Sequence, residues 1–72
     1  MKMSFGEKIR RLRESRELNQ TQLAAEVQMT QRKISYIEND KYEPSLADIV
    51  ALCQFFCVSA DYLVGLINEE RK

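Results

Sequence analysis

The chain has 72 residues, of which 44% are hydrophobic and 31% are charged, and its formal net charge is zero. That length is near the lower limit at which one hydrophobic core stabilises a fold without disulfides or a bound metal ion. We therefore expect a single domain over residues 1–72. The composition excludes a histidine-based metal site and a disulfide framework, because there is no histidine and the two cysteines, Cys53 and Cys57, lie too close in sequence.

Charge is unevenly distributed along the chain. Residues 1–33 contain eight Lys or Arg and four Glu, a formal charge of +4, whereas residues 34–72 contain three basic and seven acidic residues, a formal charge of −4. A basic half and an acidic half can orient a protein on a polyanion without net long-range attraction. The alternative interpretation is that charged helices present solvated faces.

The first predicted helix follows Ser4 and runs to about Glu17. Ser4 and Glu7 have the spacing of a capping box, in which each side chain bonds the backbone amide of the other residue. The apolar residues after this cap recur at helical spacing and form one narrow stripe: Phe5, Ile9 and Leu12. The rest of this helix is strongly charged, so it needs packing partners to hold it.

Two short helices, with a tight turn between them, are predicted over residues 20–27 and 31–38. Asn19 and Thr30 are favourable N-cap residues for them. Each helix has one apolar face, formed by these residues: Leu23 and Val27, then Ile34 and Ile37. The opposite face of the second helix carries hydrogen-bonding side chains: Gln31, Arg32, Ser35 and Tyr36. Such a face suits base edges in a DNA major groove.

Two more helices complete an all-α fold, because no segment alternates with the period of a strand. Ser45, with Asp48 three residues later, caps a fourth helix that ends at about Phe56. Its predicted inner face comprises Ile49, Leu52, Cys53 and Phe56. Ser59 caps a fifth helix, which Gly65 interrupts or ends. Residues 66–72 are expected to form a tail.

Four separated motifs resemble the Cro and phage-repressor (XRE-type) helix-turn-helix family. They are residues 18–24 (LNQTQLA), 34–39 (ISYIEN), 44–45 (PS) and 58–63 (VSADYL). The resemblance covers about residues 5–65, with the motifs in the order and spacing of the family. It implies a compact five-helix, lambda-repressor-like DNA-binding domain with its helix-turn-helix at about residues 20–38. It also implies a bacterial or phage transcriptional regulator, most often a repressor, that acts as a homodimer on a palindromic operator.

The resemblance places four side chains at the DNA surface, and the count of helical faces agrees for the last three: Gln20, Gln31, Arg32 and Tyr36. Gln31 can pair with adenine, and Arg32 with guanine or a phosphate. Ser35, on the same face of the third helix, is a further candidate for a DNA contact. Phosphate contacts are expected from a peripheral group: Arg10, Lys33, Lys41 and Tyr42.

The resemblance also implies structural roles. The family pairs the positions of Arg13 and Glu38 in an ion pair that joins the first helix to the end of the third. A dimer interface is expected at the fifth helix and tail, from Val58, Tyr62, Leu66 and Ile67. Where this chain has Gln28, Asp40 and Cys57, the family usually has glycine, or asparagine at the last position. We expect left-handed backbone at all three positions, with strain or a slightly altered turn at Gln28 and Cys57.

Two other classes of function are weighed against DNA binding. An enzyme is not expected, because the chain has no histidine, no glycine-rich phosphate loop and no nucleophile–base pair. No cofactor, metal or small-molecule ligand is expected either. A protein-interaction module is compatible with zero net charge, although the cationic face of the third helix argues against it.

Within the DNA-binding interpretation, the subtype of regulator stays open between phage repressor, antitoxin, restriction-modification controller and host regulator. Because there is no long apolar run and no signal-peptide core, we expect a cytoplasmic protein.

Overall fold

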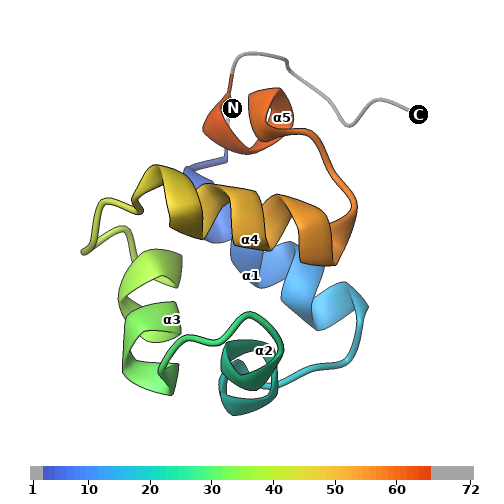
Figure 1. Cartoon of the computed structure of the whole chain (residues 1–72), viewed down its shortest axis with the longest axis vertical. Coiled ribbons are helices and arrows are strands. Elements are labelled where there is room, and N and C mark those ends of the chain that lie inside the picture. The colour runs from blue at the N-terminus through green and yellow to red at the C-terminus, as the bar shows by residue number, and fades with distance from the viewer. Residues whose placement is uncertain (1–2, 66–72) are drawn as a thin grey trace.

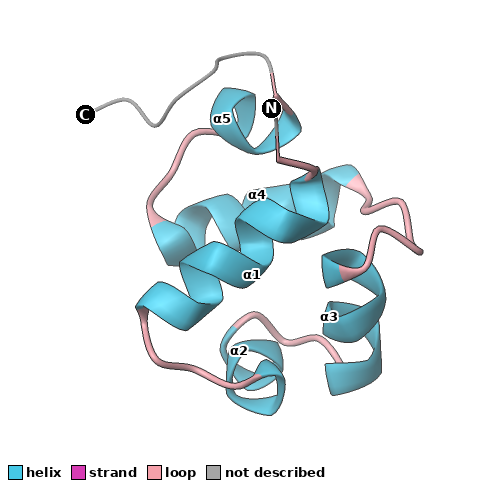
Figure 2. Cartoon of the chain, turned by 180° about the vertical axis from the view of Figure 1, so that it is seen from behind, coloured by secondary structure: helices cyan, strands magenta, loops and turns pink. Residues whose placement is uncertain are grey.

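The structure is a computed structural model that describes residues 3–65, and this part of the chain contains five helices and no strand. The helices are α1 (Phe5–Ser15), α2 (Gln20–Glu26), α3 (Gln31–Glu38), α4 (Leu46–Phe56) and α5 (Ala60–Val64). The predicted all-α fold is therefore confirmed. In Figure 1, α4 crosses the middle of the molecule, with α5 above it and α2 and α3 below it. Figure 2, from behind, shows α1 crossing the other side, where it contacts both α3 and α5.

Each helix begins directly after a residue that the sequence predicts as its N-cap. The N-cap side chains all accept a hydrogen bond from the third amide of their helix: Ser4, Asn19, Thr30, Ser45 and Ser59. Three of them form complete capping boxes, with Glu7, Gln22 and Asp48 as the reciprocal partners. The first helix ends at Ser15, two residues before its predicted end, because Glu17 adopts left-handed backbone with φ 58°.

All five helices, together with Val27 at the C-cap of α2, contribute to one buried core. Its members are Ile9, Leu23, Ala24, Val27, Ile34, Ile37, Leu52, Phe56 and Leu63. The predicted inner face of the fourth helix is only partly buried: Leu52 and Phe56 are in the core, whereas Ile49 and Cys53 are half-buried. Partial burial still raises the pKa of the Cys53 thiol above its ordinary value.

The close approach of α1 to α3 requires glycine at position 6. A Cβ atom at Gly6 would collide with the backbone carbonyl oxygens of Ile37 and Glu38. The Gly6 amide donates a hydrogen bond of 3.0 Å to Asp40 Oδ1, just beyond the end of α3. The N-terminus of α1 is therefore fixed against the end of α3.

The left-handed backbone predicted at three positions is confirmed, with φ 59° at Gln28, 59° at Asp40 and 58° at Cys57. A non-glycine residue in this region costs about 1–2 kcal/mol relative to glycine. At Asp40 the side chain offsets part of this cost, because it accepts the hydrogen bond from Gly6. Gln28 makes no such side-chain contact within the described residues, and the only one at Cys57 is a weak bond from its thiol to Gln54 O at 3.7 Å.

Candidate nucleic-acid interface

A buried ion pair lies behind the predicted interface. Arg13 Nε donates to Glu38 Oε2 at 2.6 Å, and Arg13 Nη2 donates to Glu38 Oε1 at 3.0 Å. The Glu38 side chain is fully buried and that of Arg13 is 12% exposed. The hydrogen bond to Glu38 raises the pKa of Arg13. Arg13 also donates to Leu18 O at 2.8 Å, so the pair ties α1, the loop before α2 and the end of α3 together.

A chain of hydrogen bonds runs from this pair to the protein surface. Gln20 Nε2 donates to Glu38 Oε1 at 3.0 Å, and Gln31 Nε2 donates to Gln20 Oε1 at 2.7 Å. An ionised carboxylate can only accept, so Gln20 must turn its NH₂ group toward Glu38 and its oxygen toward Gln31. The exposed Gln31 amide is thereby oriented, with its oxygen and its second N–H available to a partner outside the chain.

Arg32 and Tyr36 form a second exposed unit on α3. They lie four residues apart, and Arg32 Nε donates to the Tyr36 hydroxyl at 3.1 Å. The guanidinium carbon lies 5.7 Å from the centre of the Tyr36 ring. This contact uses only Nε, which leaves the two terminal nitrogens of Arg32 for other acceptors. We define the α2–α3 face as the half-buried side chain of Gln20 together with the exposed side chains of Gln31, Arg32 and Tyr36.

Lys33 lies apart from this face and bonds within the chain. Its Nζ donates to Asp48 Oδ1 at 2.9 Å and lies 5.2 Å from the centre of the Tyr42 ring. Asp48 is buried and also accepts from the Ser45 amide at 3.1 Å and the Tyr42 hydroxyl at 3.3 Å. Burial alone would raise the pKa of Asp48, but the bonds from Lys33 and Ser45 outweigh it and hold that pKa below its ordinary value.

The other peripheral candidates differ in their surroundings. Arg10 is half exposed, with Nε 3.7 Å from Glu38 Oε1, so its charge lies beside the hydrogen-bond chain. Ser35 is half-buried, and its carbonyl accepts from Asn39 Nδ2 at 2.8 Å. Lys41 is exposed. Any contact of these residues with DNA stays a prediction.

Two cations of the basic half have internal roles that the sequence interpretation missed. Lys8, which is 7% exposed, donates from Nζ to Tyr62 O at 2.7 Å near the end of α5. Arg16 donates to Phe55 O at 3.1 Å and to Phe56 O at 3.2 Å, at the end of α4. Cations suit helix C-termini because the last carbonyls there lack helical partners. Part of the positive charge of residues 1–33 therefore holds α4 and α5 in place.

The predicted dimer residues are only partly described. Val58 and Tyr62 are half-buried and pack against the core of their own chain. Leu66 and Ile67 lie outside the described residues.

Within residues 3–65, no three His, Cys, Asp or Glu side chains are grouped so that they could hold a metal ion. In the same residues no helix has the length and apolar character needed to cross a membrane.

Comparison with known proteins identifies the family. Residues 4–63 match a family model described as a helix-turn-helix domain. The immunity repressor protein of Bacillus phage phi105 is 33% identical over 96% of this chain, which covers 50% of that protein. The transcriptional activator BcrR of Enterococcus faecalis is 34% identical over 88% of this chain, which covers 31% of that protein. The chain thus spans half or less of the length of these two relatives.

A solved structure with the same fold is that of the P22 c2 repressor, crystallised in complex with a synthetic operator. It superposes with a TM-score of 0.82 and is 31% identical, covering 86% of this chain and 94% of the repressor chain. These three relatives are named as repressors or transcriptional regulators rather than enzymes, in agreement with the prediction of a non-enzymatic protein. The chain belongs to the helix-turn-helix family, of the Cro and phage-repressor (XRE) type.

Proposed function

We propose that this chain binds double-stranded DNA through the α2–α3 face, with α3 in the major groove, and regulates transcription. The observation that carries the proposal is the orientation of Gln31, whose amide is set through Gln20 by the buried carboxylate of Glu38. An oriented amide offers one donor and one acceptor in a fixed arrangement, which matches the edge of adenine in the major groove. The complex of the P22 c2 repressor with an operator supports this use of the fold.

The other members of the face are assigned complementary roles. Arg32 presents its terminal nitrogens to guanine or to a phosphate, and Tyr36 holds the guanidinium while its ring contacts a thymine methyl group or the DNA backbone. Gln20 acts mainly by orienting Gln31, because its own oxygen and one of its N–H groups are already bonded.

Phosphate contacts position the domain without reading sequence. Arg10, Lys41 and Tyr42 are exposed or partly exposed near this face or in the segment that follows α3, and they are our candidates. Lys33 can join them only by releasing Asp48, so we expect it to contribute less than its charge suggests. Because few cations are available, we expect modest non-specific affinity and a shallow dependence of binding on salt.

One domain of this size offers few base contacts, so we propose that two copies bind a palindromic site. A two-fold dimer places two recognition helices about 34 Å apart, which matches half-sites one helical turn apart. Repression is the sign of regulation that we favour, since two of the relatives are repressors. BcrR, an activator, is the precedent for the opposite sign.

Selection of bound sites from random duplex DNA, at two salt concentrations, tests the proposal. We expect enrichment of one sequence with two-fold symmetry. The matched control is the triple variant Gln31→Ala, Arg32→Ala, Tyr36→Ala, whose changed side chains are exposed and which should melt like the wild type. It should enrich no sequence. Absence of enrichment by the wild type would contradict the proposal and favour the protein-interaction module.

A further inference from the structure

Asp48 is a buried carboxylate whose two oxygens are bonded by groups that were expected at DNA phosphates. Its Oδ1 accepts a hydrogen bond from Lys33 Nζ at 2.9 Å, and its Oδ2 accepts one from the Tyr42 hydroxyl at 3.3 Å. The Asp48 side chain is 9% exposed, whereas that of Lys33 is 32% exposed. A single carboxylate therefore occupies the polar ends of two candidate phosphate ligands.

The bond from Lys33 is separate from the capping of α4 by Asp48. In the capping box the Ser45 amide donates to Asp48 Oδ2 at 3.1 Å, and the Asp48 amide donates to Ser45 Oγ at 3.2 Å. Oδ1 takes no part in this exchange, and within residues 3–65 its only hydrogen-bond donor is Lys33. The cap and the bond to Lys33 therefore use different oxygens and can be separated by mutation.

Asp48 competes well with a phosphate for Lys33. The hydrogen bond to Asp48 raises the pKa of Lys33, and Nζ also lies 5.2 Å from the centre of the Tyr42 ring. Moving the ammonium to DNA would leave the buried Oδ1 without its donor, which is unfavourable. Salt screens a contact with an exposed phosphate more strongly than a bond to a buried carboxylate. We therefore expect Lys33 to stay with Asp48 when the domain binds DNA.

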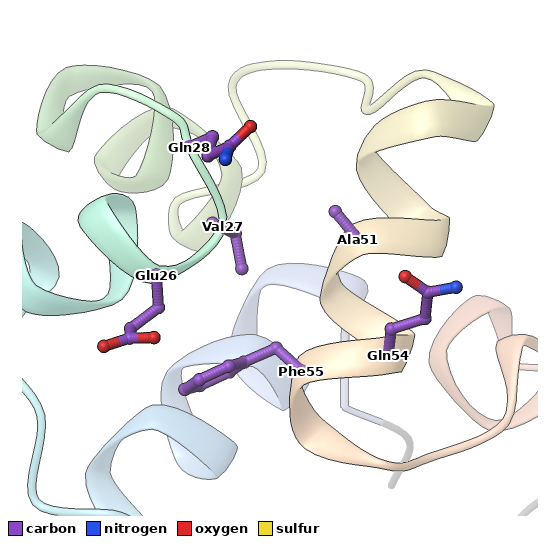
Figure 3. Close-up of a pocket in the computed structure, with 6 residues that line it drawn as sticks. All are labelled: Glu26, Val27, Gln28, Ala51, Gln54 and Phe55. Atoms are coloured by element: carbon purple, nitrogen blue, oxygen red, sulfur yellow. The ribbon is translucent and has the colours of Figure 1, made fainter.

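Few other cations lie around α3, so the state of Lys33 matters for binding. Over residues 31–45, which comprise α3 and the segment that leads to α4, the exposed cations are Arg32 and Lys41. The turn before α3 borders the groove in Figure 3, and Glu26 is the only charged residue among those that line this groove. Release of Lys33 would therefore add a third accessible cation to this part of the surface.

We propose that Asp48 withholds Lys33 and the Tyr42 hydroxyl from DNA phosphates and so limits the sequence-independent affinity of the domain. A phosphate contact strengthens binding to every sequence alike. Without this contact, the base contacts of the α2–α3 face supply a larger share of the total affinity. The inference rests on the proposed function, but it concerns how strongly the domain binds rather than which sequence it reads.

Binding of the full chain to a fluorescent duplex of arbitrary sequence, measured over a series of salt concentrations, tests the inference with Asp48→Asn. The asparagine oxygen can keep the bond from Ser45, but its NH₂ group cannot accept a bond from Lys33. We expect the slope of log affinity against log salt concentration to become steeper by about 0.9 per bound copy. The ratio of variant to wild-type affinity should then rise about threefold for each fourfold dilution of salt.

Glu43→Gln is the matched control for the loss of one negative charge. Glu43 is exposed in the segment before α4 and makes no ion pair within the described residues. This variant should change the slope by less than about 0.3, because no cation is released. Thermal unfolding verifies that every variant is folded at the temperature of the binding measurement.

Lys33→Gln identifies the group that Asp48 withholds. In the wild-type background it should change the slope by less than about 0.3, because Lys33 is not at a phosphate. In the Asp48→Asn background it should abolish the steeper slope. Lys33→Gln alone keeps Asp48, so it tests the inference even where Asp48→Asn is too unstable to be measured.

Four results would overturn the inference: an unchanged slope in Asp48→Asn, an equal change in Glu43→Gln, a steeper slope that persists in the double variant, or a slope about 0.9 shallower in Lys33→Gln alone. The last result would place Lys33 on a phosphate in the wild type. All four leave DNA binding by the α2–α3 face intact. A wild type that binds no duplex at any salt concentration would instead overturn the proposed function, and this inference with it.

Discussion

The α2–α3 face and the outward side of α4 both reach the protein surface, but they differ in the chemistry of their side chains. On the α2–α3 face, hydrogen bonds reach from Gln31 through Gln20 to the buried Glu38, so donors and acceptors have fixed directions. On the outward side of α4, the exposed side chains of Leu46 and Val50 are apolar and can form no hydrogen bonds. Fixed polar groups suit a partner that offers its own pattern of donors and acceptors, as a DNA groove does. An unoriented apolar surface suits a partner that only has to remove it from water.

A difference between internally bonded and accessible cations explains how a chain with zero net charge can bind a polyanion. Lys8, Arg13 and Arg16 are committed to carbonyl or carboxylate partners within the molecule, so they add little to a surface potential. Arg10 and Arg32 are exposed near the face that we assign to DNA. What matters for binding is therefore which cations remain accessible, rather than the sum of charges.

The largest expected effect is loss of the carboxylate behind the α2–α3 face. Glu38→Ala leaves Arg13 largely buried without its partner and should lower the free energy of unfolding by about 3–5 kcal/mol, as measured by urea denaturation. Glu14→Ala, an exposed change on the same helix as Arg13, should cost less than about 0.5 kcal/mol. If Glu38→Ala costs less than about 1 kcal/mol, the face is not anchored as we describe.

The contact between α1 and α3 ranks next. Gly6→Ala places a methyl group against the carbonyl oxygens of Ile37 and Glu38, so α1 must shift away from α3. We expect a loss of about 2–3 kcal/mol in the free energy of unfolding. DNA affinity should also fall, because the shift moves Arg13 relative to Glu38. A variant as stable as the wild type would show that this packing does not position the face.

Asp48 lies on α4 and is bonded by Lys33 of α3, and it should make stability depend on pH. Its pKa is lowered in the folded state, so its contribution is complete above the unfolded-state pKa of about 3.9 and is lost as the pH falls below that value. Asp48→Asn should cost about 1–3 kcal/mol at pH 7. Unfolding at pH 7 and pH 3 measures the effect, and the variant should lose less stability on acidification than the wild type. Equal losses would show that Asp48 is not a source of the pH dependence.

The smallest effect is expected in the turn between α2 and α3. Gln28→Gly relieves a left-handed non-glycine residue at φ 59° and should raise the free energy of unfolding by about 0.5–1 kcal/mol, after the greater unfolded-state entropy of glycine is subtracted. Glu17→Gly, at φ 58° in the loop after α1, is the matched comparison. If only Gln28→Gly destabilises the protein, the Gln28 side chain stabilises the turn by more than its left-handed backbone costs.

Sequence patterns predicted the fold well where the signal is local. All five N-caps follow from a Ser, Thr or Asn placed before a periodic apolar segment, and such caps act within a single turn. The left-handed residues at Gln28, Asp40 and Cys57 followed from a family resemblance, because only a comparison marks a position where glycine is expected. Glu17 gave no such signal and was missed.

Predictions were weaker wherever a side chain chooses between distant partners. Lys33, whose contact with phosphate stays a prediction, bonds to Asp48, 15 residues away, and Lys8 bonds to a carbonyl 54 residues away. Composition shows that these cations exist but not which carbonyl or carboxylate the fold brings to them. For the same reason the sequence could not indicate that position 6 requires glycine. That requirement comes from the close approach of α3 and not from the φ angle of Gly6 itself.

Base-by-base binding by Gln31→Ala tests the central claim most directly, namely that the oriented amide on α3 reads DNA sequence. The affinities of the wild type and the variant are measured for the selected site and for each single base-pair substitution of it, at two salt concentrations. We predict that the variant loses about 1–3 kcal/mol of discrimination at one base pair in each half-site, while the dependence of affinity on salt is unchanged. A uniform loss across all sequences, with no base pair affected more than the others, would contradict the claim and place Gln31 at the phosphate backbone; the salt dependence would again be unchanged, because a neutral amide releases no counterions.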